Sequence, residues 1–163
     1  MTKRIISIIP LAFIVLCLLL FVLPAVEQTN FYESASGYQT MFGTVQVKQY
    51  GTFYPERIGF MGVLSVIMYF ISAILIVVSV VMSFSNKDSW VVPFLLGCIA
   101  LFIFSFSYIF IAESLPKGAW NYSYGAVHYE KPKFGSGSIL TGILGIIVSI
   151  VSGILWYTKK DAD

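Results

Sequence analysis

Four stretches of this sequence contain no charged residue, and each is long enough to cross a membrane. A helix rises about 1.5 Å per residue, so about 20 apolar residues cross a hydrocarbon core about 30 Å thick. Lipid offers backbone groups no hydrogen-bond partners, so a crossing segment is a helix or part of a closed barrel. Continuous apolar runs, rather than alternating ones, favour helices. The stretches are residues 5–26, 58–86, 89–112 and 134–158, which hold 22, 29, 24 and 25 residues.

These stretches predict an all-α membrane protein, a four-transmembrane-helix bundle that forms a single membrane domain over residues 1–163. Only 11% of the residues are charged and 58% are hydrophobic, whereas an average soluble domain has about 25% charged residues. Long loops are expected at 27–57 and 113–133, and four crossings place both on the same side of the membrane. We expect the helices at about 5–26, 58–84, 89–112 and 135–158.

The basic residues orient the chain in the membrane. Lys3 and Arg4 precede the first helix and Glu27 follows it, and positive charge favours the cytoplasmic side. We therefore expect a protein of the cytoplasmic or plasma membrane with both termini in the cytoplasm. A cleaved signal peptide is the alternative for the first stretch, but the stretch exceeds the usual 7–15 apolar residues and residues 23–25 form a poor cleavage site.

The two long loops contain strand-like sequence. Residues 44–48 alternate apolar and polar side chains, and residues 38–42 precede them as a hairpin-like partner. In the second loop, aromatic residues alternate up to Tyr124 and an apolar segment follows at 126–129. We expect a small β-containing extracytoplasmic cap, with strands of both loops paired in one sheet; the alternative is an aromatic belt at the headgroup level. The expected outer contact surface consists of Tyr38, Phe42, Trp120, Tyr122 and Tyr124.

The sequence carries no catalytic or cofactor motif. His128 is the only histidine and no cysteine lies near it, so it lacks the partners that a zinc site needs. Cys17 and Cys98 lie deep in apolar stretches, and we expect two free buried thiols rather than a disulfide. We therefore predict no enzyme activity, no metal and no cofactor, and the net charge of +2 indicates no nucleic-acid partner. Asn121 begins a glycosylation sequon on the outer side.

No charged residue lies well inside a predicted helix. Arg57 opens the second helix and Glu113 closes the third, both at the outer boundary. Ionisable groups inside a membrane usually mark function. These two side chains are placed to form an ion pair between the outer ends of the two helices. The alternative is that each is solvated separately at the interface.

The fourth helix carries a regular series of small residues. Their spacing alternates between three and four, which places them on a single face of a helix. Small residues let helix backbones approach closely in lipid, so we expect this face to pack against protein along its whole length. We call it the seam; it consists of Gly135, Ser138, Gly142, Gly145, Ser149 and Ser152.

The layout resembles a known group of membrane proteins. Four crossings, a longer first outer loop with strand-like sequence and a shorter second one are similar to the build of claudin and peripheral-myelin-type tetraspan proteins. Residues 27–57 contain neither tryptophan nor cysteine, both of which mark the first loop of that group, so the resemblance assigns no residue a role. Segments 36–43 and 135–140 are similar to small uncharacterised bacterial four-helix membrane proteins, which implies no activity.

The pattern as a whole favours a protein that works by contact. We expect a scaffold or accessory subunit, with lipid and other membrane subunits as partners, because helix association by packing needs no polar site. One alternative is a small channel or transporter subunit, whose path would be lined by serines of the second helix. Another is an enzyme that uses the charged groups at the outer rim. The serines are Ser65, Ser72, Ser79 and Ser83.

Overall fold

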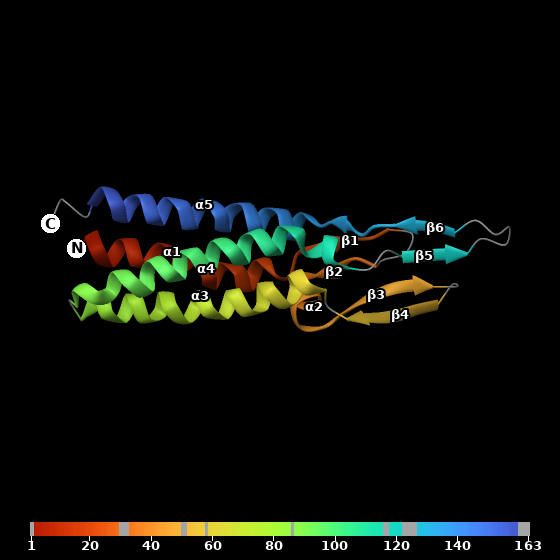
Figure 1. The fold of residues 1–163 in the computed structure, drawn as a ribbon, viewed down its shortest axis with the longest axis horizontal. Coiled ribbons are helices and arrows are strands. Elements are labelled where there is room, and N and C mark those ends of the chain that lie inside the picture. The colour runs from red at the N-terminus through yellow and green to blue at the C-terminus, as the bar shows by residue number, and fades with distance from the viewer. Residues whose placement is uncertain are drawn as a thin grey trace.

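The computed structural model shows a long helical bundle with small antiparallel sheets at one end (Figure 1). α1 begins and α5 ends at the opposite end of the bundle. We call these ends the loop end and the terminus end. The structure describes residues 2–29, 33–49, 52–57, 59–85, 87–115, 118–121 and 127–159.

The described residues include five α-helices and two 3₁₀ helices. The α-helices are α1 (Thr2–Leu20), α2 (Gly37–Phe42), α3 (Phe60–Phe84), α4 (Val91–Ile109) and α5 (Ser136–Lys159). The 3₁₀ helices η1 (Asp88–Trp90) and η2 (Phe110–Ser114) extend α4 at its two ends. α4 packs along α3 and α5, and α1 packs along the same two helices. The four long helices therefore form a closed ring of neighbours.

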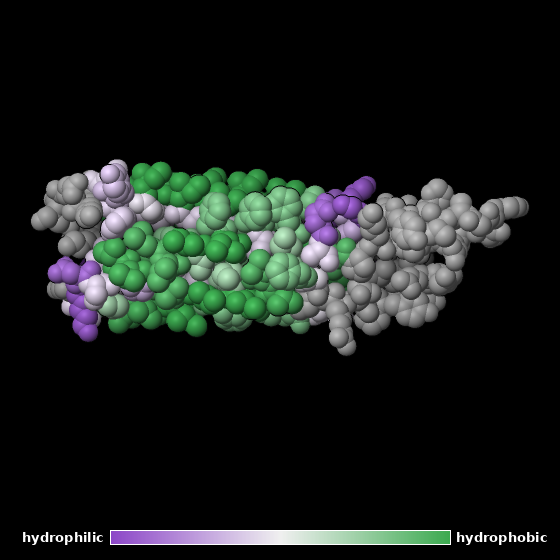
Figure 2. Space-filling model, viewed as in Figure 1, coloured by the Kyte–Doolittle hydropathy of each residue, from purple (hydrophilic) through white to green (hydrophobic). Residues whose placement is uncertain are grey.

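Three helical segments in the described part of the chain are long and apolar enough to cross a membrane: α3, Asp88–Ser114 and α5. The apolar part of α1, Arg4–Leu20, is shorter. Large hydrophobic side chains face outward along the bundle, and Leu19 is 71% exposed. Figure 2 shows this hydrophobic surface between hydrophilic residues at its two ends, as expected for a helical membrane protein.

The first helix is shorter than expected from the sequence. The prediction of a helix over 5–26 is wrong at its end, because α1 stops at Leu20 and strand β1 (Pro24–Glu27) follows. Pro24 has no N–H to continue a helix and disfavours helical geometry in the residue before it. The apolar run continues past the break, so composition alone did not locate it.

The strands form three sheets rather than one. The first sheet has the order β2-β1-β7 and joins both loops, because Glu27 of β1 pairs with Lys133 of β7. The predicted strand at 44–48 is confirmed as β3, but it pairs with β4 of the same loop, and β5 pairs only with β6. The prediction that both loops contribute to one sheet is therefore confirmed for β2-β1-β7, but it is wrong for the strands at 44–48 and 126–129. The remaining strands are β2 (Ala35–Ser36), β3 (Thr44–Gln49), β4 (Thr52–Arg57), β5 (Gly118–Asn121), β6 (Val127–Glu130) and β7 (Lys133–Phe134).

Residues 38–42 were expected as a strand and are helical instead. A capping box starts α2: the Ser36 hydroxyl accepts a hydrogen bond from the Gln39 backbone N–H, and the Gln39 side chain accepts one from the Ser36 N–H. This reciprocal pair satisfies two helix-start donors. The pattern Ser-x-x-Gln was visible in the sequence, and it outweighs the β-propensity of the aromatic residues around it.

Candidate functional site

The seam of α5 faces the inside of the bundle. All six of its residues are buried. A Cβ at Gly142 would meet the side chain of Ile109 and lie 2.8 Å from the backbone oxygen of Ser105. A Cβ at Gly145 would meet the Ser105 hydroxyl and lie 3.0 Å from the ring of Phe13. The mid-seam glycines therefore allow α5 to approach both α4 and α1 closely.

The seam serines are used differently. Ser138 donates to the carbonyl of Gly135 and Ser149 to that of Ile146, so both bond within α5. Ser152 is fully buried and its hydroxyl has no partner among the described residues. At the loop end, Gly135 lies against the backbone of Pro24 and donates its N–H to Ala25.

The serines of α3 lie inside the bundle, and two of them contact other helices. Ser65 shares a 2.9 Å hydrogen bond with Ser107 of α4, and Ser83 accepts a long one, 3.5 Å, from Ser7 of α1. Ser72 donates to Tyr69 within its own helix. Ser79 is buried without a partner in the described part of the chain. This row of hydroxyls therefore joins α3 to its two neighbours.

An aromatic cluster fills the loop end of the bundle. Phe21 is fully buried at its centre, and its ring lies 5.3–6.1 Å from four other rings. These belong to Tyr38, Tyr69, Phe104 and Tyr108, so α2, α3 and α4 contribute together with the residue that follows α1. The sequence analysis did not identify this cluster, because its members lie far apart in the chain.

The segment after α1 and the start of α2 are in close contact within this cluster. The N–H groups of Gly37 and Tyr38 donate to the carbonyls of Leu23 and Phe21. A Cβ at Gly37 would meet the Tyr108 hydroxyl and lie 2.9 Å from the Cα of Phe21. Only glycine fits there, and Gly37, next to the capping serine, is the one sequence signal that could have marked the site.

The outer rim differs in part from the predicted arrangement. Glu113 forms a 2.9 Å ion pair with Lys131. The side chain of Arg57 lies outside the described part of the structure, so its pairing with Glu113 stays a prediction. The side chains of Trp120 and His128 also lie outside the described part of the structure, and Tyr122 and Tyr124 lie outside the described residues altogether. Of the expected outer contact surface, Tyr38 and Phe42 are described, and both are exposed.

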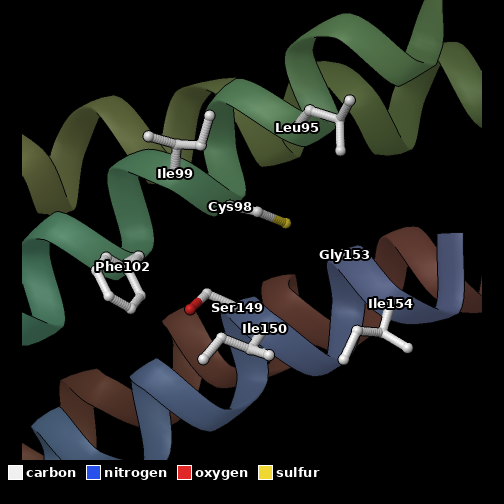
Figure 3. A pocket seen from close by; sticks show the side chains of 8 residues that line it. All are labelled: Leu95, Cys98, Ile99, Phe102, Ser149, Ile150, Gly153 and Ile154. Atoms are coloured by element: carbon white, nitrogen blue, oxygen red, sulfur yellow. The ribbon is translucent and has the colours of Figure 1, made fainter. Parts of the chain in front are cut away.

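An open apolar groove runs between α4 and α5 toward the terminus end. Figure 3 shows Cys98 of α4 directed into it, facing Ser149 and Gly153 of α5. Its volume is about 410 Å³. A Cβ at Gly153 would meet nothing within 4 Å, so the missing side chain helps to leave the groove open. Leu95, Ile99, Phe102, Ile150 and Ile154 complete the lining.

The described residues offer little reactive chemistry. Cys17 and Cys98 are free and buried. Within the ranges that the structure describes, no three residues of the types His, Cys, Asp and Glu lie close enough together to hold a metal ion. The features that these residues bring together are packing contacts: the seam, the serine row and the aromatic cluster.

The fold and its surface place the chain in the class of helical membrane proteins, because three segments can cross a bilayer and their outward side chains are hydrophobic. Compared with known protein families, with curated proteins and with solved structures, the chain shows no match. The proposals that follow therefore rest on its own geometry.

Proposed function

We propose that this chain crosses the membrane four times and works by contact, as a scaffold or accessory subunit of a membrane assembly. The first crossing is made by α1. It packs against α3 and α5 (Figure 1), and it turns Val15 and Leu19 outward. A helix packed among membrane-crossing helices, with an apolar outer face, has lipid as its natural surroundings.

The observation that carries the proposal is the position of two β-hairpins. β3–β4 and β5–β6 project beyond the helices at the loop end, with β3 next to β5 (Figure 1). A two-stranded hairpin is only marginally stable alone in water. Hairpins that extend past the apolar surface are in reach of a partner's outer domain, and pairing with one stabilises them. The bundle then acts as the anchor that holds them in place.

The proposed orientation places both termini in the cytoplasm and the hairpins outside. Lys3 and Arg4 at the start of α1 support it through the preference of basic residues for the cytoplasmic side. The build then resembles the claudin and peripheral-myelin-type layout. Tags at the two termini, probed in intact cells with protease, test it: cleavage of either tag from outside contradicts the orientation.

Purification from the native membrane in mild detergent tests the contact function. We expect a partner in fixed ratio with the full chain. Replacing residues 47–54 with a short Gly-Ser linker removes most of the β3–β4 pairing and leaves Val45 buried against the bundle. This change should release the partner while the bundle keeps its thermal stability. Tyr157→Ala at the terminus end is the control and should retain the partner. A chain that purifies alone contradicts the function, and a partner retained without the hairpin places the contact elsewhere.

A small channel is the second candidate, favoured by the buried hydroxyls without a described partner on Ser79, Thr141 and Ser152. Unpaired buried hydroxyls cost free energy unless water reaches them. Ion flux from the pure protein in liposomes, lost in Ser79→Leu, would support this candidate. Absence of flux from well-folded protein leaves the contact function.

A further inference from the structure

The short helix α2 is placed at a depth that a surface loop would not reach. The Phe42 ring lies 6.3 Å from the ring of Phe70. Phe70 is ten residues from the first residue of α3, about 15 Å along the helix axis, and its side chain leans back toward that end. Gly37, at the other end of α2, lies against Tyr108 of α4, which precedes Glu113 at the charged rim by more than one turn. Both contacts place α2 beside the apolar part of the bundle.

Several polar groups of α2 have hydrogen-bond partners within the protein. The capping box occupies the backbone N–H groups of Ser36 and Gln39. The Thr40 hydroxyl donates to carbonyls of the same turn, and the Tyr38 hydroxyl donates to Leu18 of α1. Gly43 donates its N–H to the carbonyl of Gln39 and closes the last turn. This pairing is compatible with hydrocarbon, where no water is present to bond the backbone groups.

The exposed face of α2 continues the hydrophobic surface of its neighbours. Tyr38 is 40% exposed and Phe42 50%, and their rings contact each other. Phe70 of α3, whose ring contacts that of Phe42, is also exposed, so the apolar surface continues from α2 onto α3. The apolar part of α1, Arg4–Leu20, is shorter than the three segments long enough to cross a membrane, and α2 lies where α1 ends.

We propose that α2 is embedded in the membrane, with Tyr38 and Phe42 against lipid chains, and that it completes the first crossing where α1 ends. This inference rests on the proposed crossing by α1. If α2 is embedded, a partner in water cannot reach Tyr38 and Phe42, and the hairpins are the outer contact surface that remains.

Spin labels in lipid vesicles test the proposal. Cys17→Ala and Cys98→Ala give a background to which Phe42→Cys, Leu19→Cys or Lys133→Cys is added. Molecular oxygen concentrates in hydrocarbon and a nickel chelate stays in water. We expect the label at 42, like that at 19, to collide more with oxygen than with nickel. Lys133 is exposed at the rim, and its label should show the reverse.

The outcomes separate the two proposals. A label at 42 that prefers nickel, with a label at 19 that prefers oxygen, overturns the embedding of α2 and leaves the four crossings intact. Nickel preference at both positions overturns the crossing by α1, and the inference with it. If Phe42→Cys does not fold, p-benzoylphenylalanine at position 42 is the second variant, because it keeps an aromatic ring. A photochemical adduct with phospholipid supports the embedding of α2. If no adduct forms while the label at 19 prefers oxygen, the embedding is overturned.

Discussion

The hydroxyl of Tyr38 donates a 2.6 Å hydrogen bond to the backbone carbonyl of Leu18. Leu18 lies in the last turn of α1, where carbonyls have no donor four residues ahead. The N–H of Val22, which would bond Leu18 in a continued helix, bonds Leu19 instead. A side chain from another element therefore caps the end of α1.

Tyr38→Phe should lower the stability of the bundle. It removes the only described donor to the Leu18 carbonyl outside α1, and an unsatisfied acceptor away from water costs about 1–3 kcal/mol. The thermal midpoint in detergent or bicelles measures the loss. Tyr157→Phe is a matched control, because Tyr157 is 72% exposed, and equal midpoints for the two variants would contradict the capping role.

Gly37→Ala should be strongly destabilising, whereas Gly153→Ala should not be. A Cβ at Gly37 meets the Tyr108 hydroxyl and the Phe21 backbone, while one at Gly153 meets nothing. In a helix interior, alanine is favoured over glycine by about 0.8–1 kcal/mol, so Gly153→Ala should raise the midpoint. Adding Tyr108→Phe to Gly37→Ala should restore part of the loss, because one of the two clashes is removed. A midpoint for Gly37→Ala at or above wild type would show that the contact at Gly37 is loose.

Gly142→Leu and Gly145→Leu should lower the midpoint far more than substitutions on the outer face of α5. The new side chains would displace Ile109, Ser105 or Phe13, and overpacking costs about 1–3 kcal/mol. Ile143→Leu and Ile147→Leu are the controls, because both isoleucines are exposed. Similar midpoints for the two pairs would mean that the seam tolerates bulk and does not hold α5 in place.

Ser65 and Ser107 should be energetically coupled across α3 and α4. Hydrogen bonds between membrane helices average about 0.6 kcal/mol in double-mutant cycles. We expect Ser65→Ala and Ser107→Ala each to destabilise, and the double variant to lose less than the sum. Unfolding in increasing denaturant measures the three values, and strict additivity would argue against the 2.9 Å bond.

The partner of Glu113 at the rim can be determined by charge reversal. Lys131→Glu should destabilise, and Lys131→Glu with Glu113→Lys should recover the loss. The effect should not exceed about 1 kcal/mol, because both side chains are partly exposed. Arg57→Glu with Glu113→Arg is the parallel swap: recovery there, without recovery in the lysine swap, would favour the pair predicted from sequence.

Much of the helical framework was predictable because it depends on local composition. The uncharged runs led to α3, α4 and α5 within a few residues, since lipid requires long apolar helices and charges mark their ends. The spacing of Gly142 and Gly145 placed them on one face of α5, because helical periodicity alone determines which residues share a face. The alternation of apolar and polar residues at 44–48 indicated β3, because a strand has a period of two residues.

The sequence by itself determined which segments are apolar helices and which face of α5 carries small residues. Only the tertiary structure decided where α1 ends, which strands pair, and that Phe21, Tyr38 and Tyr108 meet in one cluster. Those outcomes depend on partners distant in the chain: the carbonyl of Leu18 is capped from α2, and Gly37 must fit against α4. Sequence periodicity indicates which face of a helix or strand is buried, but it does not identify the distant residues that pack against that face.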